Sequence, residues 1–140
     1  MTAESCTGGG IGAALTAISG SSEVYKGGVI SYTDWVKHNV LGVDEKVLVQ
    51  EGAVSAAVAR AMAKGARNLL QADVAVSVTG LAGPGGDEYG NPVGTVFIGY
   101  ADCEKTDVCE FHFSGDRESV RQQAIFEALY LILENNKSGA

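Results

Sequence analysis

The chain has 140 residues, a length that suits one domain with a single hydrophobic core. Hydrophobic residues make up 46% of the sequence and charged residues 19%, a composition that excludes a disordered or fibrous chain. The formal charge is -7 and the ten Lys and Arg residues are scattered, which argues against a nucleic-acid partner because phosphate binding needs a clustered basic face.

The first expected element is a helix over residues 7–18. Apolar residues recur there at the i, i+3, i+4 and i+7 positions of one helical face, which predicts a helix that begins just after Ser5 and ends at Gly20. Only three residues precede Glu4, and a domain rarely begins so close to a dense polar and glycine-rich motif. We therefore expect N-terminal sequence to be missing.

A strand and a short helix are expected next. Residues 24–33 contain β-branched and aromatic side chains, which favour a strand. Asp34 is a suitable N-cap for a short helix over residues 35–40, and this helix carries Lys37.

A long alanine-rich helix is predicted over residues 56–70, with Ser55 as its N-cap. Val58, Met62 and Leu69 are its expected core anchors. The role of this helix is packing.

Three strands and a last helix follow. Residues 73–79 and 93–100 are predicted to be neighbouring strands of one sheet. Residues 108–113 are a further strand, which forms a hairpin with 93–100. Asp116 is expected to cap the last helix, whose core-facing residues are Val120, Ala124, Leu131 and Ile132.

The order of these elements predicts the fold class. Strands alternate with helices, which is typical of a sheet covered on both faces, and the hairpin adds antiparallel pairing. We therefore expect an α/β fold, a three-layer α/β/α sandwich with a mixed sheet, as a single domain over residues 1–140.

The cysteine content and the absence of long apolar runs bear on the compartment. No run approaches the ~20 apolar residues of a membrane span, and the N-terminus lacks a signal pattern. Cys6, Cys103 and Cys109 are an odd number, which suits a reducing compartment. Cys103, Cys109 and His112 lack the four closely spaced ligands of a structural zinc site. We expect a cytoplasmic protein with no membrane partner and no metal.

The segment AESCTGGG, residues 3–10, places Ser5 at a strand-to-helix turn that is followed by glycines. Free N–H groups of a first helical turn can hydrogen-bond an oxyanion, and the helix dipole favours negative charge there. The same geometry binds phosphates, so Thr7, Gly8 and Gly9 are candidate substrate-binding residues. Ser5 is thus either a nucleophile or only an N-cap.

A serine nucleophile needs a base. His38 and His112 lie outside any motif with glycines or acids, so we interpret both as surface or packing residues. Lys37 can serve instead when burial lowers its pKa, and it follows Tyr32 by about one helical turn. We expect Ser5, Tyr32 and Lys37 to converge, the alternative being a solvated lysine and a core tyrosine.

A glycine-rich loop over residues 79–86 follows the predicted strand 73–79, at the edge where open α/β sheets bind ligands. It lacks the lysine of a phosphate loop, and an ordinary wide turn is the alternative. Its candidate substrate-binding residues are Thr79, Gly80, Ala82 and Gly83.

Two arginines lie at the start of the last helix. Arg117 and Arg121 are four residues apart, hence on one helical face, and each is able to hold a phosphate or a carboxylate. A solvated helix surface is the alternative.

Five short motifs follow one another along the chain. From Thr2 to about Leu133 the chain carries TAESCTGG, SYTDWVK, GAVS, VTGLAGPGG and GDRESVR, and in this it resembles the CinA C-terminal domain family. That family includes nicotinamide-mononucleotide amidohydrolases.

The resemblance implies a three-layer α/β/α fold and hydrolysis of nicotinamide mononucleotide to nicotinate mononucleotide and ammonia, without metal or cofactor. Carried over by motif, it implies catalytic roles for Ser5, Tyr32 and Lys37. The 79–83 turn, Arg117 and Arg121 correspond to substrate-pocket positions.

One departure from the family pattern concerns the N-terminus, because members usually carry a helix and the start of a strand before ESCTGG. The expected partner is a small-molecule pyridine nucleotide, and we expect a homo-oligomer. The alternative function is a non-catalytic nucleotide-binding or regulatory module. The joint presence of Ser5, Tyr32 and Lys37 argues against it, since a pure binder does not need all three.

Overall fold

The computed structural model describes residues 1–137 of the chain. In this part, five strands form one mixed sheet in the order β2-β1-β3-β4-β5. Their bounds are β1 (Thr2–Glu4), β2 (Gly28–Ile30), β3 (Ala75–Gly80), β4 (Thr95–Ala101) and β5 (Thr106–His112).

The pairing of the strands brings three chain segments to one edge of the sheet. β1 lies between β2 and β3 and is parallel to both, with Glu4 opposite Ile30 and Val78. β4 is antiparallel to β3 and to β5, which confirms the expected hairpin and the mixed sheet. The carboxyl ends of β1, β2 and β3 therefore point the same way, and the loops that follow them meet.

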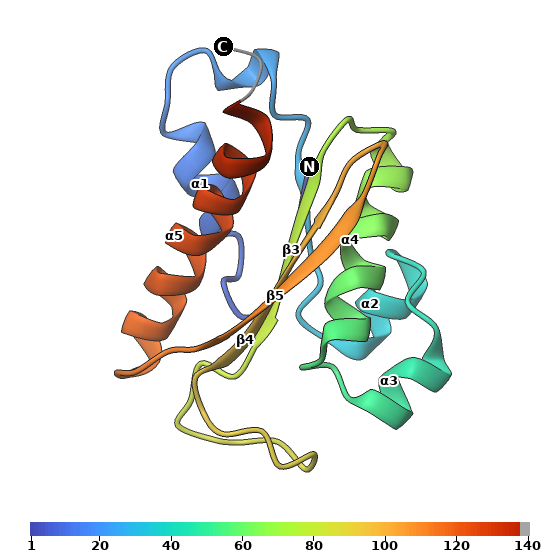
Figure 1. The fold of residues 1–140 in the computed structure, drawn as a ribbon, viewed down its shortest axis with the longest axis vertical. Helices are drawn as coiled ribbons and strands as arrows, with labels where there is room; N and C mark the ends of the chain where they lie inside the picture. Colours follow the sequence, from blue (N-terminus) through green and yellow to red (C-terminus); the bar gives the residue numbers. More distant parts are fainter. Residues whose placement is uncertain (138–140) are drawn as a thin grey trace.

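Helices cover both faces of the sheet (Figure 1). α1 (Gly10–Thr16) and α5 (Arg117–Asn136) pack on one face. α4 (Ala56–Leu70) lies on the other face, with α2 (Asp34–Asn39) and α3 (Glu45–Glu51) beside it. The three-layer α/β/α sandwich is thus confirmed, and η1 (Ser21–Glu23) is a short turn between α1 and β2.

Each face of the sheet has its own apolar core. Met62 and Val58 of α4 pack with Ala3 and Ala75 on one side. On the other side the small residues Val120, Ala124 and Ala128 let α5 approach the sheet closely. β3 and β4 are almost entirely buried because helices cover them on both sides. Within residues 1–137 no helix is both long enough and apolar enough to cross a bilayer.

The helix expected over 7–18 is shorter than predicted. α1 begins at Gly10 and not just after Ser5, because Gly8 and Gly9 take left-handed backbone angles, with φ of 60° and 104°. It ends at Thr16, before Gly20. The glycines therefore build a loop between strand and helix and are not part of the helix.

Three details between Ile18 and Gly52 also differ from the prediction. Only Gly28–Ile30 of the expected 24–33 strand is paired, because this edge strand pairs with β1 and β1 is only three residues long. Thr33, and not Asp34, caps α2 through its hydroxyl. α3 was not predicted, although Asp44 caps it through its carboxylate.

The long helix α4 matches its predicted bounds, and the Ser55 hydroxyl caps it as expected. Val58 and Met62 are fully buried, as predicted for core anchors. Leu69 is 49% exposed, so its prediction as a core anchor was wrong. The core beneath the helix continues from Ala66 to Ala72 and leaves the last turn outside.

This difference between Met62 and Leu69 predicts different stability effects. Met62→Ala removes a fully buried side chain and is expected to lower the free energy of unfolding by about 2–5 kcal/mol. Leu69→Ala, the matched truncation on the exposed last turn, is expected to change it by less than about 1 kcal/mol. Equilibrium urea unfolding of both variants measures the difference, and equal losses contradict this account of the core.

Candidate functional site

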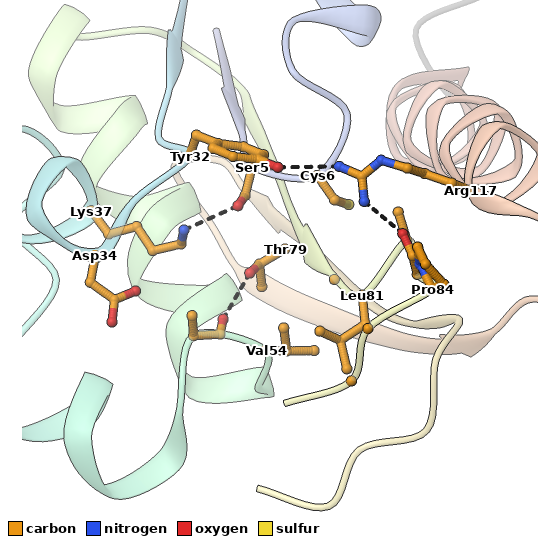
Figure 2. Close-up of a pocket in the computed structure, with 16 residues that line it drawn as sticks. Ser5, Cys6, Tyr32, Asp34, Lys37, Val54, Thr79, Leu81, Pro84 and Arg117 are labelled. Carbon is orange, nitrogen blue, oxygen red and sulfur yellow. Dashed lines mark hydrogen bonds between the residues drawn. The ribbon is translucent and has the colours of Figure 1, made fainter. Parts of the chain in front are cut away.

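A pocket of about 450 Å³ lies at the carboxyl ends of β1 and β3. Four segments that are far apart in the sequence form its walls (Figure 2). These are the end of β1, the α2 region, the loop before α4 and the glycine-rich loop after β3, joined by the first residue of α5. The lining residues are Ser5, Cys6, Tyr32, Asp34, Lys37, Ala53, Val54, Thr79, Gly80, Leu81, Ala82, Gly83, Pro84, Gly85, Gly86 and Arg117.

Ser5 and Lys37 meet in this pocket. The Lys37 side-chain nitrogen Nζ donates to Ser5 Oγ at 3.1 Å, so the predicted contact between these two residues is present. Ser5 directly follows β1, and its N–H donates to the Val78 carbonyl of the neighbouring strand at 3.0 Å. The backbone that carries Ser5 is therefore held by the sheet.

The surroundings of Lys37 favour its neutral form. The residue is 1% exposed, and burial lowers the pKa of its amine below the ordinary value of 10.5. Asp34 and Cys6 act in the opposite direction, because negative charge on either group favours the protonated amine. Among residues 1–137 no carboxylate forms a salt bridge with Lys37. Its second hydrogen bond goes to the Ser31 carbonyl, at 2.7 Å.

Tyr32 lines the same pocket but does not bond to Ser5 or Lys37. Its side chain is 58% exposed, and its hydroxyl accepts a hydrogen bond from Arg117 Nη2 at 3.2 Å. Two of the three predicted residues are thus in direct contact, and the hydroxyl of the third points toward Arg117 (Figure 2). Tyr32 lies in the β2–α2 loop with its side chain exposed, whereas Lys37 lies on α2 with its side chain buried.

Arg117 joins two walls of the pocket. Besides its bond to Tyr32, its guanidinium donates from Nη1 to the Gly83 carbonyl at 2.7 Å. A guanidinium has five N–H donors, so this residue retains donors for an anion. Figure 2 shows Arg117 and Lys37 on opposite sides of Ser5.

The glycine-rich loop after β3 forms the wall that was expected from the sequence. Thr79, Gly80, Ala82 and Gly83 all line the pocket. Thr79 Oγ1 donates to the Ala53 carbonyl at 2.8 Å and so ties the loop to the segment before α4. At Gly83, φ is 88°, a backbone angle that favours glycine.

Thr7, Gly8 and Gly9 are not among the pocket residues. The carboxylate of Glu4 fills the start of α1 instead, since it accepts hydrogen bonds from the N–H groups of Ile11 at 2.7 Å and Gly12 at 3.0 Å. Glu4 also accepts the Thr7 hydroxyl at 2.7 Å. The helix N-terminus that the sequence offered for an anion is therefore occupied by a residue of the chain itself.

Arg121 also lies outside the pocket. Its guanidinium donates from Nε to the Cys6 carbonyl at 3.0 Å and from Nη2 to the Thr7 carbonyl at 3.3 Å. Because Arg121 is one helical turn further along α5 than Arg117, it meets the loop after Ser5 and not the pocket mouth. The two arginines share a helical face but have different partners.

Several residues near the site were missed by sequence reasoning. The sequence pattern indicates Asp34 only as a helix cap and contains Ala53 and Val54 only as part of the GAVS motif, yet all three line the pocket. Glu4, which precedes Ser5, is 2% exposed. The position of Glu4 next to a serine and a run of glycines was the one signal that could have indicated its role. A buried carboxylate needs hydrogen-bond donors close by, and the N–H groups of such a loop can supply them.

Cys6 is buried and has no disulfide partner. Burial raises the pKa of its thiol to about 11, against the positive charges of Arg121, Lys37 and Arg117. Cys103 is exposed and Cys109 half-buried. In residues 1–137 no three His, Cys, Asp or Glu side chains gather as a metal site.

Similar proteins share this architecture over most of the chain. A CinA-like protein of Synechococcus sp. (strain RCC307) is 51% identical over an alignment of 133 positions, and the match covers 93% of this chain and 32% of that protein. A CinA-like protein of Endomicrobium trichonymphae is 47% identical over 130 residues, 93% of this chain and 30% of that protein. The chain thus spans about a third of the length of these curated relatives.

Solved structures agree closely with the fold. Competence damage-inducible protein A from Klebsiella pneumoniae has a TM-score of 0.92 and 41% identity, covering 95% of this chain and 83% of that one. A competence/damage inducible protein from Agrobacterium tumefaciens has a TM-score of 0.93 and 40% identity, covering 96% of this chain and 83% of that one. The sequence profile of the CinA C-terminal domain matches residues 1–135. This chain therefore belongs to the CinA C-terminal domain family.

Proposed function

We propose that this chain hydrolyses the carboxamide of nicotinamide mononucleotide to nicotinate mononucleotide and ammonia, with Ser5 as nucleophile. The observation that carries the proposal is the 3.1 Å contact between Ser5 Oγ and the buried amine of Lys37. A serine hydroxyl reacts only when a base takes its proton, and an amine whose pKa is lowered by burial is such a base. The sequence resemblance to nicotinamide-mononucleotide amidohydrolases supports the choice of substrate.

In the proposed first step the neutral Lys37 amine accepts the Ser5 proton while Ser5 Oγ attacks the carboxamide carbon. The amine keeps an N–H for the Ser31 carbonyl, and its lone pair then faces Ser5. Lys37 next donates the proton to the leaving nitrogen, ammonia departs, and an acyl ester remains on Ser5. Water, deprotonated by Lys37, hydrolyses this ester and frees the carboxylate product. No metal or cofactor takes part in this scheme.

The oxyanion of each tetrahedral intermediate needs hydrogen-bond donors. The N–H groups of Cys6 and Thr7 directly follow Ser5, and within residues 1–137 neither donates to a backbone carbonyl. We assign them as the oxyanion donors. This replaces the first turn of α1, whose N–H groups are used by Glu4.

Arg117 is the proposed phosphate ligand. The chain carries a net charge of -7, so a local positive site must come from few residues, and Arg117 is the arginine that lines the pocket. Tyr32 and Gly83 hold its guanidinium from two sides, which orients it before substrate arrives. In this scheme Tyr32 acts through Arg117 and the Ser5 proton passes directly to Lys37.

Loss of either member of the Ser5–Lys37 pair is expected to abolish turnover. Ser5→Ala and Lys37→Met should each lower ammonia release from nicotinamide mononucleotide by about 10³-fold or more, since nucleophile and base act as a unit. Ser22→Ala, on the exposed η1 turn, is the matched control and should keep full activity. A coupled ammonia assay on nicotinamide, its riboside and its mononucleotide measures this.

Two results contradict the proposal. Equal ammonia release by wild type and Ser5→Ala rules out serine catalysis. Calorimetric binding of pyridine nucleotides with no ammonia released from any of them favours the non-catalytic binding module.

The pH dependence should report the ionisation of Lys37. Activity requires the neutral amine, so kcat/KM should fall as pH falls through the Lys37 pKa, which burial places below 10.5. The Asp34 carboxylate raises that pKa, and in Asp34→Asn the fall in kcat/KM should therefore occur at lower pH. Glu104→Gln removes a matched charge at the exposed turn between β4 and β5, and it should leave the pH of this fall unchanged. A shift to higher pH in Asp34→Asn contradicts the assignment of the base.

Arg117 should control selectivity for the phosphorylated substrate. Arg117→Ala is expected to raise KM for the mononucleotide by about 10- to 100-fold, the equivalent of losing one charge-assisted hydrogen bond, and to change KM for the riboside less. Steady-state kinetics on both substrates, with the exposed Lys64→Ala as control, test this. If the preference for the mononucleotide is unchanged, the glycine-rich loop holds the phosphate instead.

A further inference from the structure

The loop between β1 and α1 is held from two sides by charged side chains, the buried Glu4 and the half-buried Arg121. Glu4 accepts hydrogen bonds from the Thr7 hydroxyl and from the first N–H groups of α1. Arg121 reaches the same loop from α5 and donates to two of its carbonyls. Neither side chain lines the pocket, so neither is placed to contact substrate.

The hydrogen bonds of this loop fix three consecutive peptide planes. The Ser5 carbonyl accepts the Gly8 N–H at 3.0 Å, the Cys6 carbonyl accepts Arg121 Nε at 3.0 Å, and the Thr7 carbonyl accepts Arg121 Nη2 at 3.3 Å. In a trans peptide the C=O and N–H groups point in opposite directions. Fixing the Ser5 and Cys6 carbonyls therefore fixes the directions of the Cys6 and Thr7 N–H groups.

The Thr7 N–H depends most directly on Arg121. It shares a peptide with the Cys6 carbonyl that Arg121 binds, so it points away from the guanidinium. The other carbonyl held by Arg121, that of Thr7, belongs to the peptide whose N–H closes the Gly8–Ser5 hydrogen bond. Arg121 thus acts on two of the three planes.

The Arg121 guanidinium is positioned by α5, which packs firmly against the sheet. Val120 and Ala124, which flank Arg121 on α5, are fully buried against the sheet. The guanidinium lies next to Gly8, where a Cβ atom would be 3.7 Å from Arg121 Nη2, an ordinary van der Waals distance. The positive charge of Arg121 also acts on the Cys6 position, next to Ser5.

We propose that Arg121 is a positioning residue that orients the Cys6 and Thr7 N–H groups as a pair of oxyanion donors beside Ser5. This inference rests on the proposed role of Ser5 as nucleophile. In this inference Arg121 helps to stabilise the transition state and does not bind substrate. Arg117, in contrast, is the proposed ligand of the substrate phosphate.

The test separates kcat from KM. Removal of one oxyanion donor typically lowers kcat by about 10²–10³-fold, and loss of its orientation should have a smaller effect. Arg121→Gln is expected to lower kcat by about 10- to 100-fold with KM within about two-fold of wild type. Arg121→Lys keeps the positive charge and one donor group, so its kcat should lie between those of wild type and Arg121→Gln. It replaces Arg121→Gln in the test if the glutamine variant does not fold. Arg60→Gln is the matched control, because Arg60 likewise donates to a backbone carbonyl, that of Thr106, away from the site.

A second readout does not depend on the substrate. A fluorophosphonate forms an Oγ–P bond with Ser5 and releases fluoride, and the oxygen on phosphorus takes the oxyanion position. The labelling rate, measured by intact mass with Ser5→Ala as blank, should be about 10- to 100-fold lower in Arg121→Gln and unchanged in Arg60→Gln.

The outcomes separate this inference from the proposed function. If wild type releases no ammonia from nicotinamide mononucleotide but Arg121→Gln is labelled more slowly than wild type, the substrate is wrong and the role of Arg121 stands. A folded Arg121→Gln that is labelled at the wild-type rate overturns the role. A raised KM with unchanged kcat also overturns it, because that result places Arg121 on the substrate. Wild-type protein that is neither active nor labelled refutes both proposals.

Discussion

The burial of the Lys37 amine against Ser5 is the interaction on which the rest of the site depends. A charged lysine is costly to bury without a partner, and in residues 1–137 no carboxylate pairs with this one. The fold therefore stabilises the neutral amine, which is the form that a base requires. The contact exists because β1 and β2 are adjacent and parallel: Ser5 follows the first strand, and the segment after the second carries Lys37.

The mixed sheet explains why the pocket lies where it does. Parallel pairing of β1 with β2 and β3 brings three loops to one edge, which is where open α/β sheets bind ligands. The antiparallel β4 and β5 extend the sheet beyond β3, and β5 leads into α5, so that Arg117 at the start of that helix faces the same edge. One topology thus supplies the proposed nucleophile, its base and the proposed phosphate ligand.

Charged residues around Ser5 divide into two groups with different partners. Lys37 and Arg117 line the pocket, whereas Glu4 and Arg121 hold the backbone of the loop that carries Ser5. In the proposed scheme, side chains of the second kind do not meet substrate, but they limit the freedom of the peptide groups proposed to bind it. An active-site loop rich in glycine needs such support, because glycine leaves the backbone with many accessible conformations.

Much of this arrangement was predictable from local patterns. Apolar periodicity and capping residues predicted α4 and α5, and the β-branched runs predicted β3 and the hairpin, because these signals lie within one element. The motifs also indicated Ser5 and Lys37. What only the tertiary structure decided was the choice among partners: Arg121 and Arg117 look alike in the sequence, yet one binds loop carbonyls and the other faces the pocket. Likewise Glu4 occupies the helix start that the sequence left open for a ligand. These choices depend on distances between segments far apart in the chain, and those distances are set by strand order and helix packing.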